Sequence, residues 1–173
     1  RDPYTAGHQT RSADLARAIA TEMEIPKAKI DGIGMAGAIH DIGKLSVPAE
    51  ILTKSSKLTK VEFALVKEHA VKGYEMLKDV ESDWPLAEMV YQHHERMDGS
   101  GYPNRLKDRE ICVESRILMV ADTVDAMINH RPYRPAFEID EVITDFLPGQ
   151  KSRFDPVVID AVNVLYQNNF FES

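Results

Sequence analysis

The sequence is poor in several features, and each scarcity excludes a class of protein. Cys112 is the only cysteine among 173 residues, so no disulfide can form within the chain, which suits a reducing compartment. No apolar run approaches the roughly 20 residues of a membrane-spanning helix. The net charge of −7 argues against broad binding of nucleic-acid polymers, because that requires a basic surface. We therefore expect neither a membrane segment nor a nucleic-acid polymer as partner.

Strand-like alternation is also scarce, whereas helical periodicity recurs between the prolines. Hydrophobic residues make up 43% and charged residues 28% of the chain, as is typical of a globular protein. We expect an all-α bundle and a single domain over residues 1–173. The predicted helices cover residues 5–24, 30–42, 59–77, 86–94, 114–128, 139–146 and 156–168, and the third begins with a capping box at 59–62.

The strongest functional signal is the pair His40-Asp41. Neighbouring side chains on a helix point about 100° apart, so the two could reach one ion, or Asp41 could bridge two. Lys44 shares a helix face with His40 and could place a cation beside a bound phosphate. Seen alone, the pair is equally compatible with a hydrogen bond on a helix surface. The apolar residues around it indicate burial, and a buried charge needs a partner or a metal.

Five further nitrogen and oxygen donors lie elsewhere in the chain. His93 and His94 follow an apolar stripe, and His8 and His69 lie at the boundaries of amphipathic helices. Taken singly, the adjacent pair could lie on a helix surface, and the other two could be hydrogen-bonded core histidines. Asp122 ends an apolar run, where metal ligation explains a carboxylate better.

Together these donors are too many for one tetrahedral ion but suit two ions bridged by a carboxylate and a water. The candidate ligands are His8, His40, Asp41, His69, His93, His94 and Asp122. Imidazole and carboxylate ligands without thiolate suit first-row divalent ions. We expect two divalent ions, Fe or Mn first, with Ni, Co or Zn as alternatives.

A series of motifs runs along nearly the whole chain in a fixed order. They are Asp2-Pro3-Tyr4-Thr5 leading to His8, His40-Asp41-Ile42-Gly43-Lys44, Glu68-His69, His93-His94-Glu95-Arg96, Asp98-Gly99-Ser100-Gly101-Tyr102-Pro103, Ala121-Asp122, Asp125-Ala126, Arg131-Pro132-Tyr133-Arg134 and Phe154-Asp155-Pro156. With this ordered set the chain resembles the HD-GYP domains, a branch of the HD superfamily of metal-dependent phosphohydrolases.

The resemblance implies an HD-domain helical bundle with an HD-GYP C-terminal extension. It implies hydrolysis of cyclic di-GMP to linear pGpG, and in some members on to GMP, and it assigns metal ligation to all the candidate ligands above. It also implies phosphate contacts from Lys44, Arg131 and Arg134, and a place for Tyr102 at the rim. Some members hold a third metal through a glutamate where this chain has Tyr4, which favours two metals here.

The mechanism expected from the resemblance has Asp41 and a hydroxide bridging the ions, with the hydroxide attacking phosphorus. Asp41 and Lys44 are the expected catalytic residues, and the two arginines stabilise phosphoryl charge. Asp125, one helical turn after Asp122, is expected to orient a ligand.

Several alternatives remain open from the sequence. The substrate could be 3′,3′-cyclic GMP-AMP, the domain could be a catalytically weak cyclic-dinucleotide sensor or scaffold, or it could be another HD enzyme such as a nucleotidase. The last is disfavoured by His69, His93, His94 and the Gly-Tyr-Pro loop. We expect a bacterial cytoplasmic protein, cut from a longer chain with an N-terminal regulatory domain. Partners beyond the substrate would be that domain in cis or a second copy.

Overall fold

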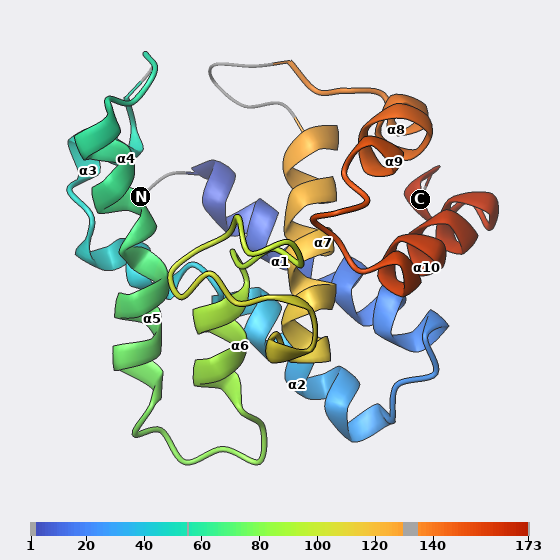
Figure 1. Cartoon of the computed structure of the whole chain (residues 1–173), viewed down its shortest axis with the longest axis horizontal. Helices are drawn as coiled ribbons and strands as arrows, with labels where there is room; N and C mark the ends of the chain where they lie inside the picture. The colour runs from blue at the N-terminus through green and yellow to red at the C-terminus, as the bar shows by residue number, and fades with distance from the viewer. Residues whose placement is uncertain (1–2, 55, 130–134, 173) are drawn as a thin grey trace.

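The structure, a computed structural model, describes residues 3–54, 56–129 and 135–172. Within these ranges the regular elements are helical, apart from one isolated bridge between Asp98 and Lys107 (Figure 1). The predicted all-α class is therefore confirmed. In the part of the chain described, no helix combines the length and the apolar character needed to cross a membrane.

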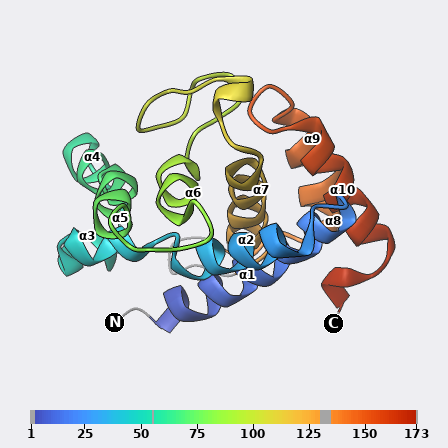
Figure 2. The same cartoon turned by 90° about the horizontal axis from the view of Figure 1, so that it is seen from below.

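Three helices form the centre of the bundle: α1 (Pro3–Glu22), α2 (Lys27–Ile39) and α7 (Val113–Ile128). Helix α1 packs against both α2 and α7 (Figure 2). Its buried stripe has helical spacing, as does that of α7; the residues are Leu15, Ala16, Ile19 and Ala20 on α1 and Ile117, Val120, Ala121 and Val124 on α7. Each large aliphatic side chain buried in this way stabilises the fold by about 1.5–3 kcal/mol.

A C-terminal group of helices covers another side of α1 and α7. Elements α8 (Ile139–Glu141), η3 (Val142–Phe146, a π-helical turn) and α9 (Leu147–Gly149) follow one another directly, so the helix predicted over 139–146 extends further. Helix α10 (Pro156–Gln167) is preceded by its N-cap residue Asp155, whose carboxylate accepts a hydrogen bond from the backbone amide of Val157 at 2.9 Å. This N-cap satisfies one of the unpaired amides of the first turn.

On the opposite side, short helices frame the candidate site. They are η1 (Ile42–Ser46), α3 (Ala49–Leu52), α4 (Lys60–Lys67), α5 (His69–Leu77) and α6 (Leu86–Gln92); the 3₁₀ turns η2 (Asp108–Glu110) and η4 (Phe170–Glu172) lie further along the chain. The predicted capping box is confirmed: Thr59 accepts from the backbone of Glu62, and Glu62 from the backbone of Thr59.

Three helix boundaries differ from the prediction beside histidines. The helix expected over 59–77 is divided at Glu68, where the last turn of α4 tightens to a backbone hydrogen bond from Glu68 to Leu65. Helices α2 and α6 end at Ile39 and Gln92, so His40 and His93 cap these helices instead of lying within them. Most of the candidate ligands consequently lie at helix ends, whereas His8 and Asp122 lie within α1 and α7.

Candidate metal centre

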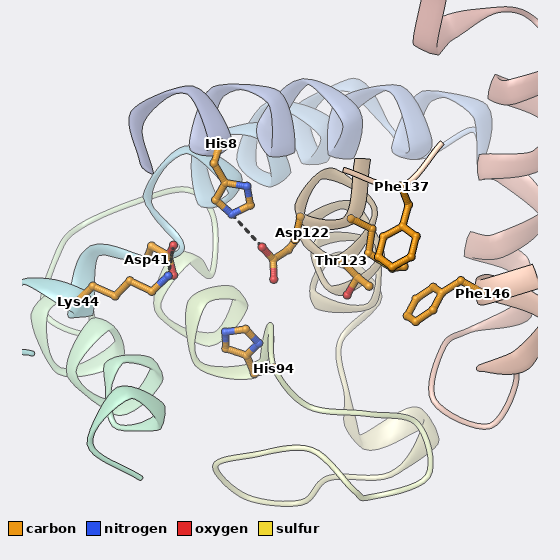
Figure 3. Close-up of a pocket in the computed structure, with 10 residues that line it drawn as sticks. His8, Asp41, Lys44, His94, Asp122, Thr123, Phe137 and Phe146 are labelled. Atoms are coloured by element: carbon orange, nitrogen blue, oxygen red, sulfur yellow. Dashed lines mark hydrogen bonds and ion pairs between the residues drawn. The ribbon is translucent and has the colours of Figure 1, made fainter. Parts of the chain in front are cut away.

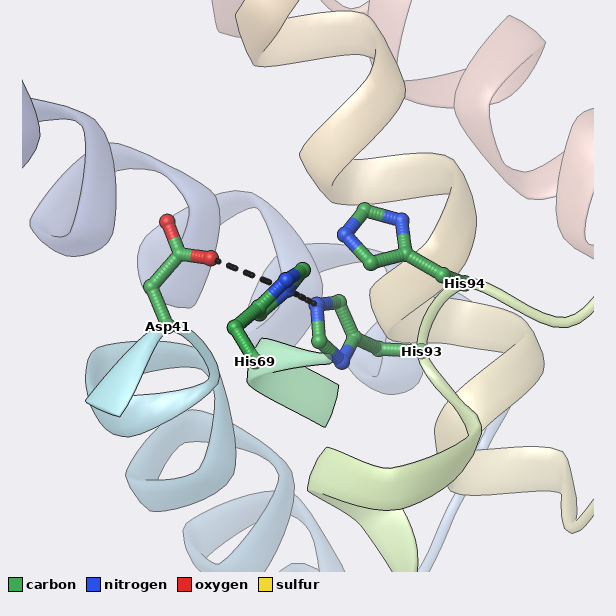
Figure 4. A group of neighbouring side chains, drawn as sticks. All are labelled: Asp41, His69, His93 and His94. Carbon is green, nitrogen blue, oxygen red and sulfur yellow. Dashed lines mark hydrogen bonds and ion pairs between the residues drawn. The ribbon is translucent and has the colours of Figure 1, made fainter. Parts of the chain in front are cut away.

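All the candidate ligands converge in one region, although they come from separate elements. Two groups of donors have ligand atoms within 4.8 Å of one another. We call them the His69 group, comprising Asp41, His69, His93 and His94 (Figure 4), and the His8 group, comprising His8, His40 and Asp41. Asp41 belongs to both. Asp122 lies beside the His8 group, with its Oδ1 atom 3.0 Å from Nε2 of His8 and 3.7 Å from Nε2 of His40.

Three histidines are oriented by backbone carbonyls at the ends of helices. In each, Nδ1 contacts the carbonyl oxygen three residues earlier; the pairs are His40 with Gly37 at 2.6 Å, His69 with Val66 at 2.5 Å, and His93 with Val90 at 2.5 Å. A carbonyl is only an acceptor, so Nδ1 must carry the proton. The last carbonyls of a helix lack partners within it, and these rings supply them. Each Nε2 is then left with a lone pair.

The resulting lone pairs face one another across the centre. Nε2 of His69 lies 3.4 Å from Nε2 of His93, and neither atom has a proton to donate to the other. Nε2 of His40 is buried and has no hydrogen-bond partner among the described residues. Buried polar atoms are normally satisfied, so convergent acceptors of this kind fit a cation. Histidine metal ligands also characteristically donate their second ring nitrogen to a carbonyl or carboxylate.

The charge states of the buried groups agree with cation binding. Burial lowers the pKa of His93 to about 3, and it also lowers the pKa of His69 and His94, so these rings are neutral near pH 7. Burial alone would raise the pKa of Asp41, but the electrostatic influence of its neighbours His40 and Lys44 holds it well below its usual value. Neutral imidazoles around an ionised carboxylate are the donor set that first-row divalent ions prefer.

His8 is held differently from the other histidines, by side chains. Its Nδ1 lies 2.6 Å from the carboxylate of Asp125, which also accepts hydrogen bonds from Arg11 at 2.8 Å and Asn129 at 3.0 Å. Burial would lower the pKa of His8, but hydrogen bonds to Asp122 and Asp125 raise it to about 9. A cation between Nε2 and Asp122 would replace the proton that these carboxylates otherwise favour.

The expected place of Asp125 behind a ligand thus matches its observed contact with His8. Arg11 was not anticipated. Its position one helical turn after His8 was the available signal, since residues three apart share a helix face.

Two glycines allow the chain segments around the donors to approach closely. A Cβ atom on Gly43 would lie 1.9 Å from the carbonyl oxygen of His69, and one on Gly101 would lie 2.4 Å from the backbone nitrogen of Arg96. Neither position has room for a side chain. The glycines that follow His40-Asp41 and precede Tyr102 are therefore packing requirements of the site.

The loop containing Gly101 is fixed by Glu95, a fully buried residue. Its carboxylate accepts hydrogen bonds from the backbone amides of Asn104 at 2.7 Å and Leu106 at 3.0 Å. The loop in turn places the ring of Tyr102 in a stack on His94, with ring centroids 4.8 Å apart. Burial raises the pKa of the Tyr102 phenol, so this ring stays neutral and packs against a candidate ligand.

A cavity of about 530 Å³ opens beside the donors (Figure 3). The histidines and charged residues that line it are His8, Asp41, Lys44, His94 and Asp122, and the remaining lining residues are Thr123, Ala126, Met127, Phe137 and Phe146. Nζ of Lys44 lies 2.6 Å from Asp41. The two phenylalanines were not anticipated, because neither belongs to a motif, although Phe137 lies three residues after Arg134. Arg131 and Arg134, expected to contact phosphate, lie outside the described residues.

The HD domain family model matches residues 1–158. This chain belongs to the HD domain family. The expected relationship is thereby confirmed.

Curated relatives share this sequence over most of the chain. A cyclic di-GMP phosphodiesterase of Thermotoga maritima is 38% identical over 165 residues, covering 93% of this chain and 44% of the relative. The 3′3′-cGAMP-specific phosphodiesterase 3 of Vibrio cholerae is 37% identical over 156 residues, covering 90% and 34%. The chain thus spans less than half the length of these relatives.

Among solved structures, the chain is similar to Bd1817, an HDG"Y"P protein from Bdellovibrio bacteriovorus. The TM-score is 0.77 at 18% sequence identity, covering 94% of this chain and 52% of the other. At that identity the likeness supports the HD-domain helical fold.

Proposed function

We propose that this chain is a metal-dependent phosphodiesterase that hydrolyses a cyclic dinucleotide, with cyclic di-GMP as the first candidate and pGpG as its first product. The observation that carries the proposal is the facing pair of unprotonated Nε2 atoms on His69 and His93, 3.4 Å apart beside the carboxylate of Asp41. The names of the relatives supply the substrate class.

Two divalent cations, Fe or Mn first and Ni, Co or Zn as alternatives, would supply Lewis acidity that activates water and neutralises phosphate charge. The His69 group would hold one, and the His8 group with Asp122 the other. Asp41 would serve both, since its Oδ1 lies 3.6 Å from Nε2 of His69 and its Oδ2 lies 3.5 Å from Nε2 of His40.

Lys44 is suited to bind a phosphoryl oxygen. Its ammonium group lies 2.6 Å from Asp41 and lines the cavity, and its side chain is 31% exposed, so it can reach a ligand there. Arg131 and Arg134 remain predicted phosphate ligands, because guanidinium groups bind phosphate oxygens in pairs. A single HD-GYP domain over residues 1–173, with a regulatory domain elsewhere in a longer bacterial protein, remains part of the proposal.

The experiment that tests this function combines metal analysis with product analysis. The protein is reconstituted anaerobically with Fe or Mn, its metal content is measured, and the products of cyclic di-GMP are separated by chromatography. We expect about two ions per chain and metal-dependent conversion to pGpG. Full activity in chelator-treated, metal-free protein would contradict the proposal.

A second candidate substrate is 3′,3′-cyclic GMP-AMP, because a relative of nearly equal identity is named as specific for it. Parallel assays with both dinucleotides decide between them. A protein that binds either dinucleotide without turning it over in any metal-loaded form would instead be a sensor or scaffold.

A further inference from the structure

The cavity beside the metal centre has two chemically different ends (Figure 3). Asp41 and Lys44 lie at one end, and Phe137 and Phe146 lie at the other, with Asp122 and Thr123 of α7 between them. The volume of about 530 Å³ is within the range of roughly 300–1,000 Å³ typical of small-molecule sites. One ligand could therefore reach from the charged end to the apolar end.

The apolar end is built by three separate elements. Met127 lies in the last turn of α7, Phe146 ends η3, and Phe137 lies in the segment that precedes α8. The backbone amide of Phe137 donates to the carbonyl of Met127 at 3.0 Å, which fixes this segment against α7. The three side chains form what we call the apolar shelf.

The exposure of Phe137 points to a ligand. Phe137 lines the cavity and is 40% exposed, so part of its side chain can be reached by a ligand in the cavity. An aromatic ring fixed at the wall of a cavity next to a charged centre provides a flat face for another ring.

The shelf offers contact area and few hydrogen bonds. Apart from Thr123, the described residues lining this end have apolar side chains, and the hydroxyl proton of Thr123 is donated to the carbonyl of Met119 at 2.8 Å. Stacking of a base on an aromatic side chain is tolerant of sequence, because every base has a π-face. A ring held in this way is bound by its face and not by its edge.

We propose that Met127, Phe137 and Phe146 hold one purine base of the cyclic dinucleotide by face contact, and that this subsite accepts guanine and adenine alike. The inference rests on the proposed function, whose substrate joins phosphates that suit the Lys44 end to purines that suit the shelf. It adds to that function a base subsite and a reason why both cyclic di-GMP and cyclic GMP-AMP would fit.

The test compares Phe137→Ala and Phe137→Leu with wild type in the metal-loaded protein. Loss of a stacking contact removes binding shared by the ground state and the transition state, so KM should rise at least about 5-fold with kcat nearly unchanged. The rise should be equal for the two dinucleotides within about 2-fold, because the face contact does not depend on base identity. The KM of Phe137→Leu, which keeps apolar area but has no ring, should lie between the KM values of wild type and Phe137→Ala.

Two controls separate base binding from a structural role. Phe63→Ala removes a phenylalanine of similar exposure, 49%, that does not line the cavity, and its KM should match wild type. Metal content and hydrolysis of methyl p-nitrophenyl phosphate, a phosphodiester without a purine, report on the metal centre alone.

The outcomes distinguish the two proposals. If wild type hydrolyses dinucleotides but Phe137→Ala leaves KM unchanged, or lowers metal content, the shelf does not bind a base. A KM change confined to one dinucleotide would overturn the equal acceptance of both purines. If metal-loaded wild type hydrolyses neither dinucleotide, the proposed function itself fails. Calorimetric binding of both dinucleotides to wild type and Phe137→Ala then tests the shelf without turnover, and equal affinities would reject it.

Discussion

The candidate metal centre contains two kinds of histidine, which differ in the group that contacts their Nδ1 atom. His40, His69 and His93 are held by backbone carbonyls at helix ends, whereas His8 is held by the carboxylate of Asp125. The backbone anchors are fixed by the fold, and no single side-chain substitution removes them. His8 is instead held by the side chain of Asp125, which can be replaced. A substitution there should lower the metal affinity of the His8 group without affecting the His69 group.

The largest effect should come from the donor that both groups share. Asp41→Ala should remove both ions and reduce turnover by about 1,000-fold or more, because no other described residue belongs to both groups. Elemental analysis and a hydrolysis assay measure the two effects. Asp79→Ala, at an exposed position, is the matched control and should resemble wild type. Retained metal and turnover in Asp41→Ala would remove the bridging role.

The next effect separates the two groups. His69→Ala should lose the ion of the His69 group and keep the other, whereas His8→Ala should do the reverse, so each should retain about one ion per chain. Elemental analysis measures how many ions each variant retains, and anomalous scattering from crystals of each variant locates the remaining ion. Loss of both ions in both variants would show that the two groups bind metal cooperatively and would contradict the claim that each group can lose its ion separately.

A smaller loss of metal affinity is expected when Asp125, the side chain that holds His8, is substituted. Asp125→Asn keeps the shape of the residue but removes the charge that faces His8 and Arg11. Replacing such a partner typically weakens metal affinity by about 10- to 100-fold, and here the loss should be confined to the ion of the His8 group. Competition with a chelator measures the affinity, and Asp160→Asn, exposed on α10, is the control. An equal loss of affinity for both ions would show that the two donor groups do not bind metal independently.

The smallest expected effect is a loss of stability in α4, the helix whose Val66 carbonyl contacts His69. Glu62 caps α4, whose residue Val66 accepts from His69, and hydrogen bonds from Lys54 and the backbone of Thr59 lower the pKa of Glu62 from 4.5 to about 2. Because the folded pKa is depressed, the stabilisation is present above pH 4.5 and is lost as the pH falls toward about 2.

Glu62→Gln should therefore lower the thermal midpoint slightly at pH 7, and the difference from wild type should shrink on acidification below pH 4.5. Thermal unfolding followed by circular dichroism at several pH values measures this. Metal content at pH 7 should not change, because one fraying turn does not remove the carbonyl of Val66. A difference that grows with acidification would contradict the assigned role of the carboxylate.

The sequence was sufficient to predict the helical class and to select the donors that the fold brings together, for different physical reasons. Helical periodicity records which face is buried, so α7 and α10 were predicted nearly to their ends. The donors were recognised because carboxylates and imidazoles beside apolar residues need partners.

Other features left no signal in hydrophobic periodicity. At the ends of α2 and α6 the rings of His40 and His93 contact carbonyl oxygens three residues earlier, and helix propensity does not encode such contacts between a side chain and the backbone. Phe137 and Phe146 read as ordinary apolar residues in sequence, and only the packing against α7 brings them to the cavity.

The most direct test of the central claim is a crystal structure of the Fe- or Mn-loaded protein with anomalous scattering recorded at the metal edge. Two anomalous peaks are expected, one bonded to Nε2 of His69 and His93, the other to Nε2 of His8 and His40, with Asp41 bonded to both. A map in which Nε2 of His69 and Nε2 of His93 remain 3.4 Å apart with no peak beside them would contradict the account.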